Sequence, residues 1–461
     1  MAREIDQDLA FLCNNIERLN QKWNITDGPV KSRRPVVGWL LTILKRCIRK
    51  TVYWLIRPYW DQQIEFNRIL AATAADIYRI QCRLLQLNEQ NDAARPEDIP
   101  LRVSGPRIVQ LVSSLNFGDA VGNEVIAFKR ALQENGYITE IYANYIQDKI
   151  PPEMARFYKD MPPLQADDIV IYHFASECSI SNDIRNFPCR VILRYHNVTP
   201  PEFFHGFDSN AEKATTKGLL QVKKLIPYID YCLPVSEFNR QDLIKMGYAC
   251  PMKVLPILIR FEDYEQEPDA GVIQKYSDGV TNFLFVGRIA PNKKLEDVIS
   301  VFAYYKEHYD EQARLFLVGS FQETDLYYQY LQNHIKKLNI HDVIFPGHIS
   351  FQAILAYYKI ADLFLCMSEH EGFCVPVVEA MYFSVPIVAY DSSAIPDTLG
   401  HAGVLVKSKD PREIAPYIQE NLHRTQFKKQ QAERIHSLNK KVIEKNLMEW
   451  IHQIYEAKIK V

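Results

Sequence analysis

Two glutamates eight positions apart are the residues whose types and spacing point most clearly to chemistry. Glu371 is followed by Gly372, and Glu379 comes beyond Pro376. The mostly apolar run at 361–367 predicts a buried strand, and the residues after Pro376 predict a helix, because proline is tolerated in a first turn. A strand, a tight glycine turn and a helix N-terminus together form a site for anions.

Carboxylates next to an anion site are suited to binding sugar rather than phosphate. A carboxylate accepts hydrogen bonds from hydroxyl groups. Glu371 in the loop and Glu379 about one turn into the helix can face the same pocket. The combination predicts a nucleotide-sugar site. Two glutamates at this spacing also occur by chance, so the prediction depends on the glycine, the proline and the strand that accompany them.

Composition sets broad limits on fold and partners. The chain has 461 residues, enough for two sizeable cores and an extension. Its formal net charge of −2 gives no global case for binding nucleic acid. The nine cysteines are scattered without a CxxC pair, so the sequence carries no zinc or thioredoxin-like signature. No apolar run reaches the roughly 18 residues that a membrane span needs.

Strand and helix patterns alternate from Arg107 onwards. The predicted strands are 108–112, 169–172, 191–193 and 231–235 in a first series, and 283–287, 315–319, 343–345 and 387–390 in a second. Two such α/β series predict two doubly wound, Rossmann-like domains at 101–260 and 261–420, with a cleft between them. The acidic segment 260–278 is expected to be an irregular hinge. Helices in 421–461 are expected to pack back on the N-terminal domain.

Residues 1–100 are expected to form an α-helical N-terminal extension. The segment 31–57 has basic and no acidic side chains, and its apolar and basic positions fall on opposite faces of a helix. Such a helix suits an anionic membrane surface, although helices of this kind also pack on their own protein. Two seven-residue apolar series predict a short coiled-coil-like helix at 59–87, which either pairs with a second chain or packs on the chain's own domains.

The second half of the chain resembles the family-4 retaining glycosyltransferases of the GT-B fold. The matching segments are 285–293, 317–319, 346–348 and 371–379, the last being the family's E-x7-E element, and the first half adds 195–197 and 235–238. The resemblance covers residues 106–420 and leaves out the first hundred residues. It implies the GT-B fold and sugar transfer from a nucleoside diphosphate, with no metal and no cofactor.

The resemblance implies roles for five side chains. Arg288 and Lys293 would stabilise the negative charge that develops on the departing diphosphate, because preorganised donors do this best. Glu371 would bind hydroxyl groups of the donor sugar, and Glu379 would bind the ribose. His196 would lie at the sugar end of the cleft.

Backbone groups are implied as well. The N–H groups near Gly372 and Phe373, at a helix N-terminus, would add to the diphosphate site. The backbone at Gly347 and His348 would meet the base. In the retaining members the acceptor hydroxyl is thought to enter on the leaving-group face, with a phosphate oxygen helping to take its proton. No protein nucleophile is therefore named.

Three positions depart from the family pattern. A glycine usually follows the lysine of the Arg-to-Lys loop, but Lys294 stands there, so either lysine could meet the phosphate and Lys293 is ranked first. The loop with Gly118 and Gly122 looks like the one near diphosphate and acceptor, yet a tighter double glycine is common in the family. Cys374 stands where a small residue is common and is expected to pack in an apolar turn.

The predicted activity is transfer of a hexose to a glycan or lipid-linked acceptor in cell-surface polysaccharide assembly. GDP-mannose and UDP-glucose are the first candidate donors, and the resemblance implies retention. The alternative is a non-catalytic scaffold that binds nucleotide sugar and assembles through its N-terminal helices. The intact Arg288, Lys293 and glutamate pair argue against that alternative. A phosphorylase of this fold would need a pyridoxal-phosphate lysine, for which the sequence has no motif.

Weaker signals in the sequence bear on location and metal binding. Scattered cysteines without a signal peptide predict the cytoplasm, with peripheral attachment to the inner face of the plasma membrane through 31–57. The Asp6-Gln7-Asp8 sequence spells the metal element of a different glycosyltransferase fold, but it has no strand before it and is expected to be solvated surface. His173 follows a predicted strand, where a structural role and a place lining the cleft are both open.

Overall fold

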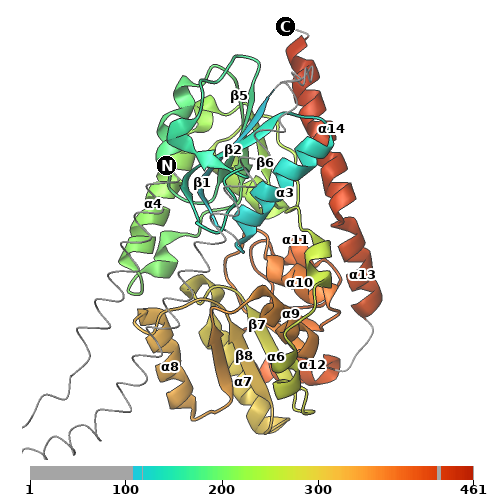
Figure 1. The fold of residues 1–461 in the computed structure, drawn as a ribbon. Helices are drawn as coiled ribbons and strands as arrows, with labels where there is room; N and C mark the ends of the chain where they lie inside the picture. Colours follow the sequence, from blue (N-terminus) through green and yellow to red (C-terminus); the bar gives the residue numbers. More distant parts are fainter. Residues whose placement is uncertain (1–106, 117, 423–426, 460–461) are drawn as a thin grey trace, which may run out of the picture. The chain divides into compact units, whose positions relative to one another are not determined.

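The computed structural model describes residues 107–116, 118–422 and 427–459 (Figure 1). The helices predicted at 31–57 and 59–87 and the Asp6-Gln7-Asp8 sequence lie outside the described residues, so the predictions made for them stay predictions. Within the described part of the chain, no helix is both long and apolar enough to cross a lipid bilayer.

The first half of the described chain folds around a six-stranded parallel sheet in the order β3-β2-β1-β4-β5-β6. Its strands are β1 (Ile108–Leu115), β2 (Thr139–Ile146), β3 (Arg156–Phe157), β4 (Ile169–Phe174), β5 (Arg190–Tyr195) and β6 (Tyr231–Pro234). The central strands are almost continuously apolar because both faces of such a sheet are covered, and β4 is buried along its whole length.

Helices and short 3-10 turns connect these strands. They are α3 (Ala120–Glu134), α4 (Ser209–Lys224) and α5 (Glu237–Met246), with η1 (Tyr158–Asp160), η2 (Ser179–Asn182), η3 (Ile184–Asn186), η4 (Pro201–Phe204) and η5 (Ile226–Tyr228). Helix α3 begins directly after Asp119, whose carboxylate accepts a hydrogen bond from the Gly122 N–H. This cap satisfies one of the N–H groups that a helix start leaves unpaired.

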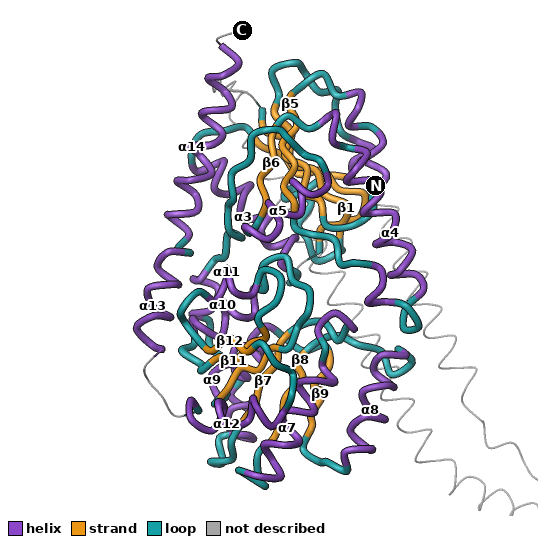
Figure 2. Tube along the Cα trace, turned by 180° about the vertical axis from the view of Figure 1, so that it is seen from behind, coloured by secondary structure: helices purple, strands orange, loops and turns teal. Residues whose placement is uncertain are grey.

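The second half repeats the arrangement, with the sheet order β12-β11-β10-β7-β8-β9. Its strands are β7 (Asn282–Val286), β8 (Arg314–Val318), β9 (Val343–Gly347), β10 (Leu363–Cys366), β11 (Ile387–Tyr390) and β12 (Val404–Val406). Its helices are α6 (Ala270–Tyr276), α7 (Leu295–His308), α8 (Leu326–Leu338), α9 (Phe351–Ile360), α10 (Val375–Tyr382), α11 (Ile395–Leu399) and α12 (Pro411–Asn421), with η6 (Phe261–Glu265) and η7 (Pro291–Lys293). Figure 2 shows strands enclosed by helices in both halves.

Counted along the chain, both sheets follow the order 3-2-1-4-5-6 of doubly wound nucleotide-binding folds. The prediction of two Rossmann-like domains is therefore confirmed. In such sheets the chain reverses its winding direction between the first and fourth strands, and ligands bind beyond the carboxyl ends of the strands at that point. Here the two switch points lie between β1 and β4, and between β7 and β10.

Two helices follow the second sheet, α13 (Phe427–Ser437) and α14 (Lys440–Ile459). Helix α14 lies beside the N-terminal domain (Figure 1), where Ile443, Leu447 and Ile451 pack in one buried cluster with Phe128 of α3. Helix α13 contacts the C-terminal domain instead, since the Gln431 amide donates to the Val385 carbonyl at 2.8 Å. The end of the described chain therefore touches both domains.

The segment 260–278, expected to be irregular, contains the turn η6 and the helix α6. Tyr264 and Tyr276, each 8% exposed, belong to the core of the C-terminal domain. The expectation of irregular structure was wrong along most of this segment, because burying two aromatic side chains there offsets the cost of ordering the backbone. The role of the segment as a hinge stays a prediction.

Candidate active site

The loops that follow β7 and β10 form the centre of the site in the C-terminal domain. The first runs from Gly287 to Lys294, and the second from Met367 to Cys374. Because β7 and β10 are adjacent parallel strands, their carboxyl ends lie side by side at the switch point. The two predicted motifs, 78 positions apart in the chain, meet there through the hydrogen bond of Lys293 with Glu371.

Lys293 and Glu371 form an ion pair with two short contacts. The Lys293 Nζ lies 2.6 Å from Glu371 Oε1 and 2.7 Å from Oε2. Glu371 is 9% exposed. Burial lowers the pKa of Lys293, but attraction to Glu371 outweighs it, so the net pKa is raised and the lysine is charged. Each charge thus already has a partner, and a ligand that binds either group must compete with that partner.

The Glu371 loop is held in place by two neighbouring loops. The Asn292 amide donates to the His370 carbonyl at 3.0 Å, and the Glu369 N–H donates to the Asn292 carbonyl at 3.0 Å. From the other side, the Glu371 N–H donates to Ser393 Oγ at 2.9 Å. The backbone at Glu371 is therefore preorganised.

The other two basic residues of the first loop differ from each other. Arg288 is exposed and has no hydrogen bond or ion pair with any described residue. Lys294 has a left-handed backbone with φ 51°, which explains why a glycine suits this position. Its Nζ lies 3.6 Å from Glu296 and 3.7 Å from Glu369. Arg288 is thus available for a ligand, whereas Lys294 already lies between two carboxylates.

Glu379 is held by two tyrosines. It lies inside α10, where Oε1 accepts from the Tyr264 hydroxyl at 3.0 Å and Oε2 accepts from the Tyr358 hydroxyl at 2.7 Å. Burial raises the pKa of Glu379, which the two hydroxyl donors partly offset. The two glutamates of the motif therefore have separate partners in this structure. The sequence contained no signal for either tyrosine, because they lie on η6 and α9.

The turn between the two glutamates is tightly packed. Phe373 and Cys374 are 5% and 7% exposed. Cys374 caps α10 with a left-handed backbone, and the neighbouring Cys366 thiol and burial raise its pKa well above the usual range. A Cβ added to Gly372 would lie 2.3 Å from the His196 carbonyl oxygen. Only glycine lets this loop approach the other domain so closely.

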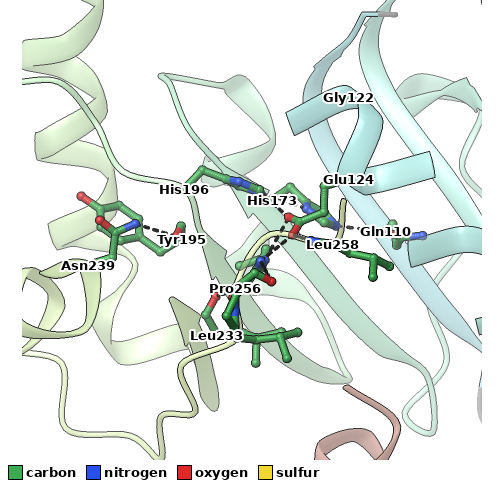
Figure 3. Close-up of polar contacts among 12 residues, drawn as sticks. Gln110, Gly122, Glu124, His173, Tyr195, His196, Leu233, Asn239, Pro256 and Leu258 are labelled. Atoms are coloured by element: carbon green, nitrogen blue, oxygen red, sulfur yellow. Dashed lines mark hydrogen bonds and ion pairs between the residues drawn. The ribbon is translucent and has the colours of Figure 1, made fainter. Parts of the chain in front are cut away.

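The N-terminal domain presents His196 at the end of β5 (Figure 3). Its Nε2 lies 3.2 Å from His173 Nδ1 and 3.5 Å from Glu124 Oε2. Glu124 forms a fully buried ion pair with Arg194 at 2.5 Å. The sequence prediction named His196 but missed Glu124 and Arg194. An arginine within the apolar run of β5 was the only available signal.

The loop after β1 lies at the switch point of the N-terminal domain, between β1 and β4. Gly118 has φ +90°, in the left-handed region. A Cβ on Gly122 would lie 2.1 Å from the Asn116 carbonyl oxygen, so α3 can start here only with glycine at that position. Gly347, with φ +78°, and the exposed His348 lie at the end of β9, two strands away from β7.

The two domains meet where these loops end. His370 Nε2 lies 2.7 Å from Asn197 Oδ1, and the Asn197 amide donates to Asn239 at 2.7 Å. The structure therefore brings Lys293, Glu371 and Gly372 together with the His196 backbone. No contact joins Glu379, Gly347 or His348 to that group within the described residues.

Two buried clusters have the residue types of metal ligands. One combines Glu124, His173 and His196, and the other combines Cys366, Glu371 and Cys374. In the first, Arg194 and the Leu258 N–H occupy the carboxylate. In the second, the Lys293 ammonium occupies the carboxylate. In both clusters the carboxylate therefore already has a cationic partner.

Residues 273–438 match the family model described as "Glycosyl transferases group 1". The match covers the C-terminal domain and supports the predicted family over that region.

Curated relatives are similar over parts of their length. The chain is 25% identical over 242 residues to the O-antigen chain mannosyltransferase B of Escherichia coli, covering 50% of this chain and 61% of that protein. It is 25% identical over 263 residues to the amylovoran biosynthesis glycosyltransferase AmsK of Erwinia amylovora, covering 54% and 60%. The alignments span 61%, 33% and 50% of the length of the first three relatives.

Solved structures share the fold at low sequence identity. The sucrose-phosphate synthase of Thermosynechococcus elongatus aligns with a TM-score of 0.60 and 16% identity, covering 76% of this chain and 100% of that one. Anabaena HepE in complex with UDP-glucose aligns with a TM-score of 0.55 and 18% identity, covering 75% and 99%. Together with the two sheets, these similarities establish the GT-B fold of the described residues.

Proposed function

We propose that this chain is a glycosyltransferase that moves a hexose, with retention, from a nucleoside-diphosphate sugar to a glycan or lipid-linked acceptor. The observation that carries the proposal is the pairing of Lys293 with Glu371 at the switch point, with the unpartnered Arg288 on the same loop. Lys293 and Arg288 are cations that suit a diphosphate, and the neighbouring Glu371 is a carboxylate that suits sugar hydroxyls.

The ion pair suggests how the donor is received. Lys293 would exchange Glu371 for a phosphate oxygen, and Glu371 would then accept hydrogen bonds from sugar hydroxyls. Arg288 would contribute a second cation, and the N-terminus of α10 adds a positive partial charge. These groups stabilise the leaving diphosphate as the bond to the sugar breaks. A phosphate oxygen would take the proton of the acceptor hydroxyl, so the protein need not supply a nucleophile.

The relatives of this chain support the biological setting. O-antigen, amylovoran and colanic acid glycosyltransferases are among the proteins to which this chain is similar. We therefore place the activity in cell-surface polysaccharide assembly. GDP-mannose and UDP-glucose remain the first donors to test, since relatives include mannosyltransferases and a neighbour was solved with UDP-glucose.

The first experiment is a panel of nucleotide sugars screened for thermal stabilisation, because a ligand that binds only the folded state raises its stability by mass action. The stabilising donor is then used in transfer assays, with the anomer of the product read by NMR. We expect Arg288→Ala to abolish stabilisation and transfer, while Arg185→Ala, an exposed arginine in η3, retains both. Full transfer by Arg288→Ala would contradict the site. Stabilisation without transfer to any acceptor would favour the scaffold.

We further propose that 31–57 attaches the protein to the cytoplasmic face of a membrane and that 59–87 mediates self-association. The support is the charge and apolar pattern of these segments. Deleting residues 1–60 should move the protein from the membrane to the soluble fraction of cells. Retention of all protein on membranes after this deletion would refute the attachment.

A further inference from the structure

Three polar side chains form a row that runs through the N-terminal domain to the domain boundary. Gln110 lies on β1, His173 on β4 and His196 directly after β5, and these three strands are consecutive in the sheet. The Gln110 carboxamide lies 3.0 Å from His173 Nε2, and His173 Nδ1 lies 3.2 Å from His196 Nε2. Figure 3 shows the three side chains in this order. All three are at least nine-tenths buried.

The first side chain in the row acts as a donor. With its nitrogen towards His173, the Gln110 amide donates to His173 Nε2 at 3.0 Å and to the Val125 carbonyl at 3.3 Å, while its oxygen accepts from the Lys129 N–H at 3.2 Å. The opposite orientation would set the amide oxygen against the Val125 carbonyl oxygen. The surroundings of Gln110 therefore select the donor orientation.

The donor orientation determines the tautomers of both histidines. His173 accepts at Nε2, so its proton is on Nδ1, and that N–H donates to His196 Nε2. His196 consequently accepts at Nε2 and has its own proton on Nδ1. Both rings are neutral, because burial lowers the pKa of His173 and of His196 well below the usual range. The positive charge of Arg194 lowers both values further.

Glu124 does not reverse the direction of the hydrogen bond that His173 donates to His196. Its Oε1 accepts from Arg194 Nη2 and from the Leu258 N–H, and its Oε2 accepts from Arg194 Nε at 3.0 Å. Glu124 Oε2 lies 3.5 Å from His196 Nε2, which is farther than His173 Nδ1 at 3.2 Å. The stronger contact at Nε2 is therefore the one from the His173 N–H.

The row ends in a donor without an acceptor. His196 Nδ1 is buried and has no hydrogen-bond partner among the described residues. A buried N–H that stays unpaired destabilises the folded state. The His196 backbone lies against Gly372 of the donor loop. A ligand oxygen within hydrogen-bond distance of Nδ1 would satisfy the unpaired N–H.

We propose that Gln110 and His173 are positioning residues that hold His196 in the Nδ1–H tautomer, so that His196 offers a neutral hydrogen-bond donor to a hydroxyl oxygen of the bound sugar. This inference rests on the proposed function for the identity of the ligand. The tautomer itself follows from the row of contacts alone. A neutral donor suits a hydroxyl group, whereas a cation would favour the diphosphate.

The test reads the tautomers directly. Histidine labelled with ¹⁵N is incorporated into the full chain, and long-range ¹⁵N–¹H correlations are recorded at pH 7.5. Variants His173→Asn and His196→Asn assign the two signals. We expect protonated Nδ1 and unprotonated Nε2 in both rings of the wild-type protein. A protonated Nε2 on His196 would overturn the inference.

A second arm tests the positioning role through Gln110→Met, which keeps the volume and removes the donor. We expect a mixed tautomer signal from His196 and about a tenfold lower kcat/KM for the nucleotide sugar. Losses of this size are typical when a residue that orients a ligand-binding histidine is replaced. The matched control is Gln431→Met, which also removes a buried amide that donates to a backbone carbonyl. It should leave both readouts unchanged.

The two arms separate the inference from the proposed function. The expected tautomers in a protein that binds no nucleotide sugar would refute the function and leave the tautomer assignment standing. Sugar transfer by a wild-type protein whose His196 is protonated at Nε2 would refute the tautomer assignment and leave the proposed function standing. An unchanged kcat/KM in Gln110→Met would refute the positioning role.

Discussion

At the scale of single residues, the Lys293–Glu371 ion pair is the central feature of the site. Both charges are largely removed from water, and each carboxylate oxygen of Glu371 contacts the ammonium. Such a pair contributes little net stability, because desolvation opposes the attraction. In the proposed function, the pair holds both groups in position until a ligand replaces one of the partners.

The first prediction concerns Glu371→Gln. The amide keeps the size of the side chain, but it has no negative charge to strengthen the hydrogen bonds that it accepts from sugar hydroxyls. We expect kcat/KM to fall by about 10- to 150-fold, the equivalent of charged hydrogen bonds worth about 1.5–3 kcal/mol. Steady-state kinetics with the stabilising nucleotide sugar measure this.

The neighbouring Glu369→Gln is the control for that prediction. Glu369 pairs with Lys294 and Lys409 and makes no contact with Lys293. Its loss should change kcat/KM by less than about threefold, as for exposed ion pairs. Equal losses in the two variants would show that Glu371 has no special role.

At the scale of elements, glycines decide how closely loops approach each other. The Glu371 loop reaches the end of β5 only because Gly372 has no Cβ, since the nearest atom to one would be a carbonyl oxygen at 2.3 Å. The nearest atoms are the carbonyl group of His196 and the Cβ of Asn197, and none of them is the far end of a flexible side chain that could move aside. The position of Glu371 relative to His196 therefore depends on this one residue.

The second prediction is that Gly372→Ala separates the two loops. Displacement of a reacting group by about 1 Å can cost about 100-fold in rate, and we expect a loss of that order in kcat. The control is Gly271→Ala in the first turn of α6, where the nearest atom belongs to the Asp269 side chain. Helix propensity favours alanine there by up to about 1 kcal/mol, so thermal stability should hold or rise. Full activity of Gly372→Ala would contradict the close approach.

At the scale of the whole molecule, the described domains are linked through a histidine. His370 of the C-terminal domain contacts Asn197 of the N-terminal domain, and its ring packs near Phe203 and Phe238. Burial lowers the pKa of His370 to about 4. Protonation of this residue therefore opposes the folded, connected state.

The third prediction follows from the sign of that shift. Between the ordinary histidine pKa of 6.5 and about 4, the unfolded chain binds more protons at this residue than the folded chain does. Stability should thus be full above pH 6.5 and decline as the pH falls towards 4. His173 and His196, whose pKa values are also lowered, act in the same direction.

Urea unfolding at intervals from pH 7.5 to pH 4.5 measures this dependence. His370→Gln keeps an amide donor for Asn197 but does not titrate, so its stability should fall less steeply with acid than that of the wild type. His348→Gln, which replaces an exposed histidine, should retain the wild-type slope. A wild-type slope in His370→Gln would contradict the prediction.

Local sequence patterns predicted the two-domain fold and several residues of the candidate site. The two series of apolar runs predicted the doubly wound domains, because parallel strands buried on both faces must be apolar along their length. The glycine turn between two glutamates singled out Glu371 by residue type and spacing, and the resemblance to a known family added Arg288, Lys293 and His196.

The tertiary structure alone decided which partner each of these groups has. The pairing of Glu371 with Lys293, the two tyrosines on Glu379 and the row from Gln110 to His196 join residues from separate strands and loops. Such contacts arise from sheet order and close packing, which no local pattern encodes. Likewise, the sequence of 260–278 predicted irregular structure, whereas two tyrosines of this segment lie in the core of the C-terminal domain. Residue type thus revealed the chemistry available, and packing selected the protonation state, the partner and the position of each group.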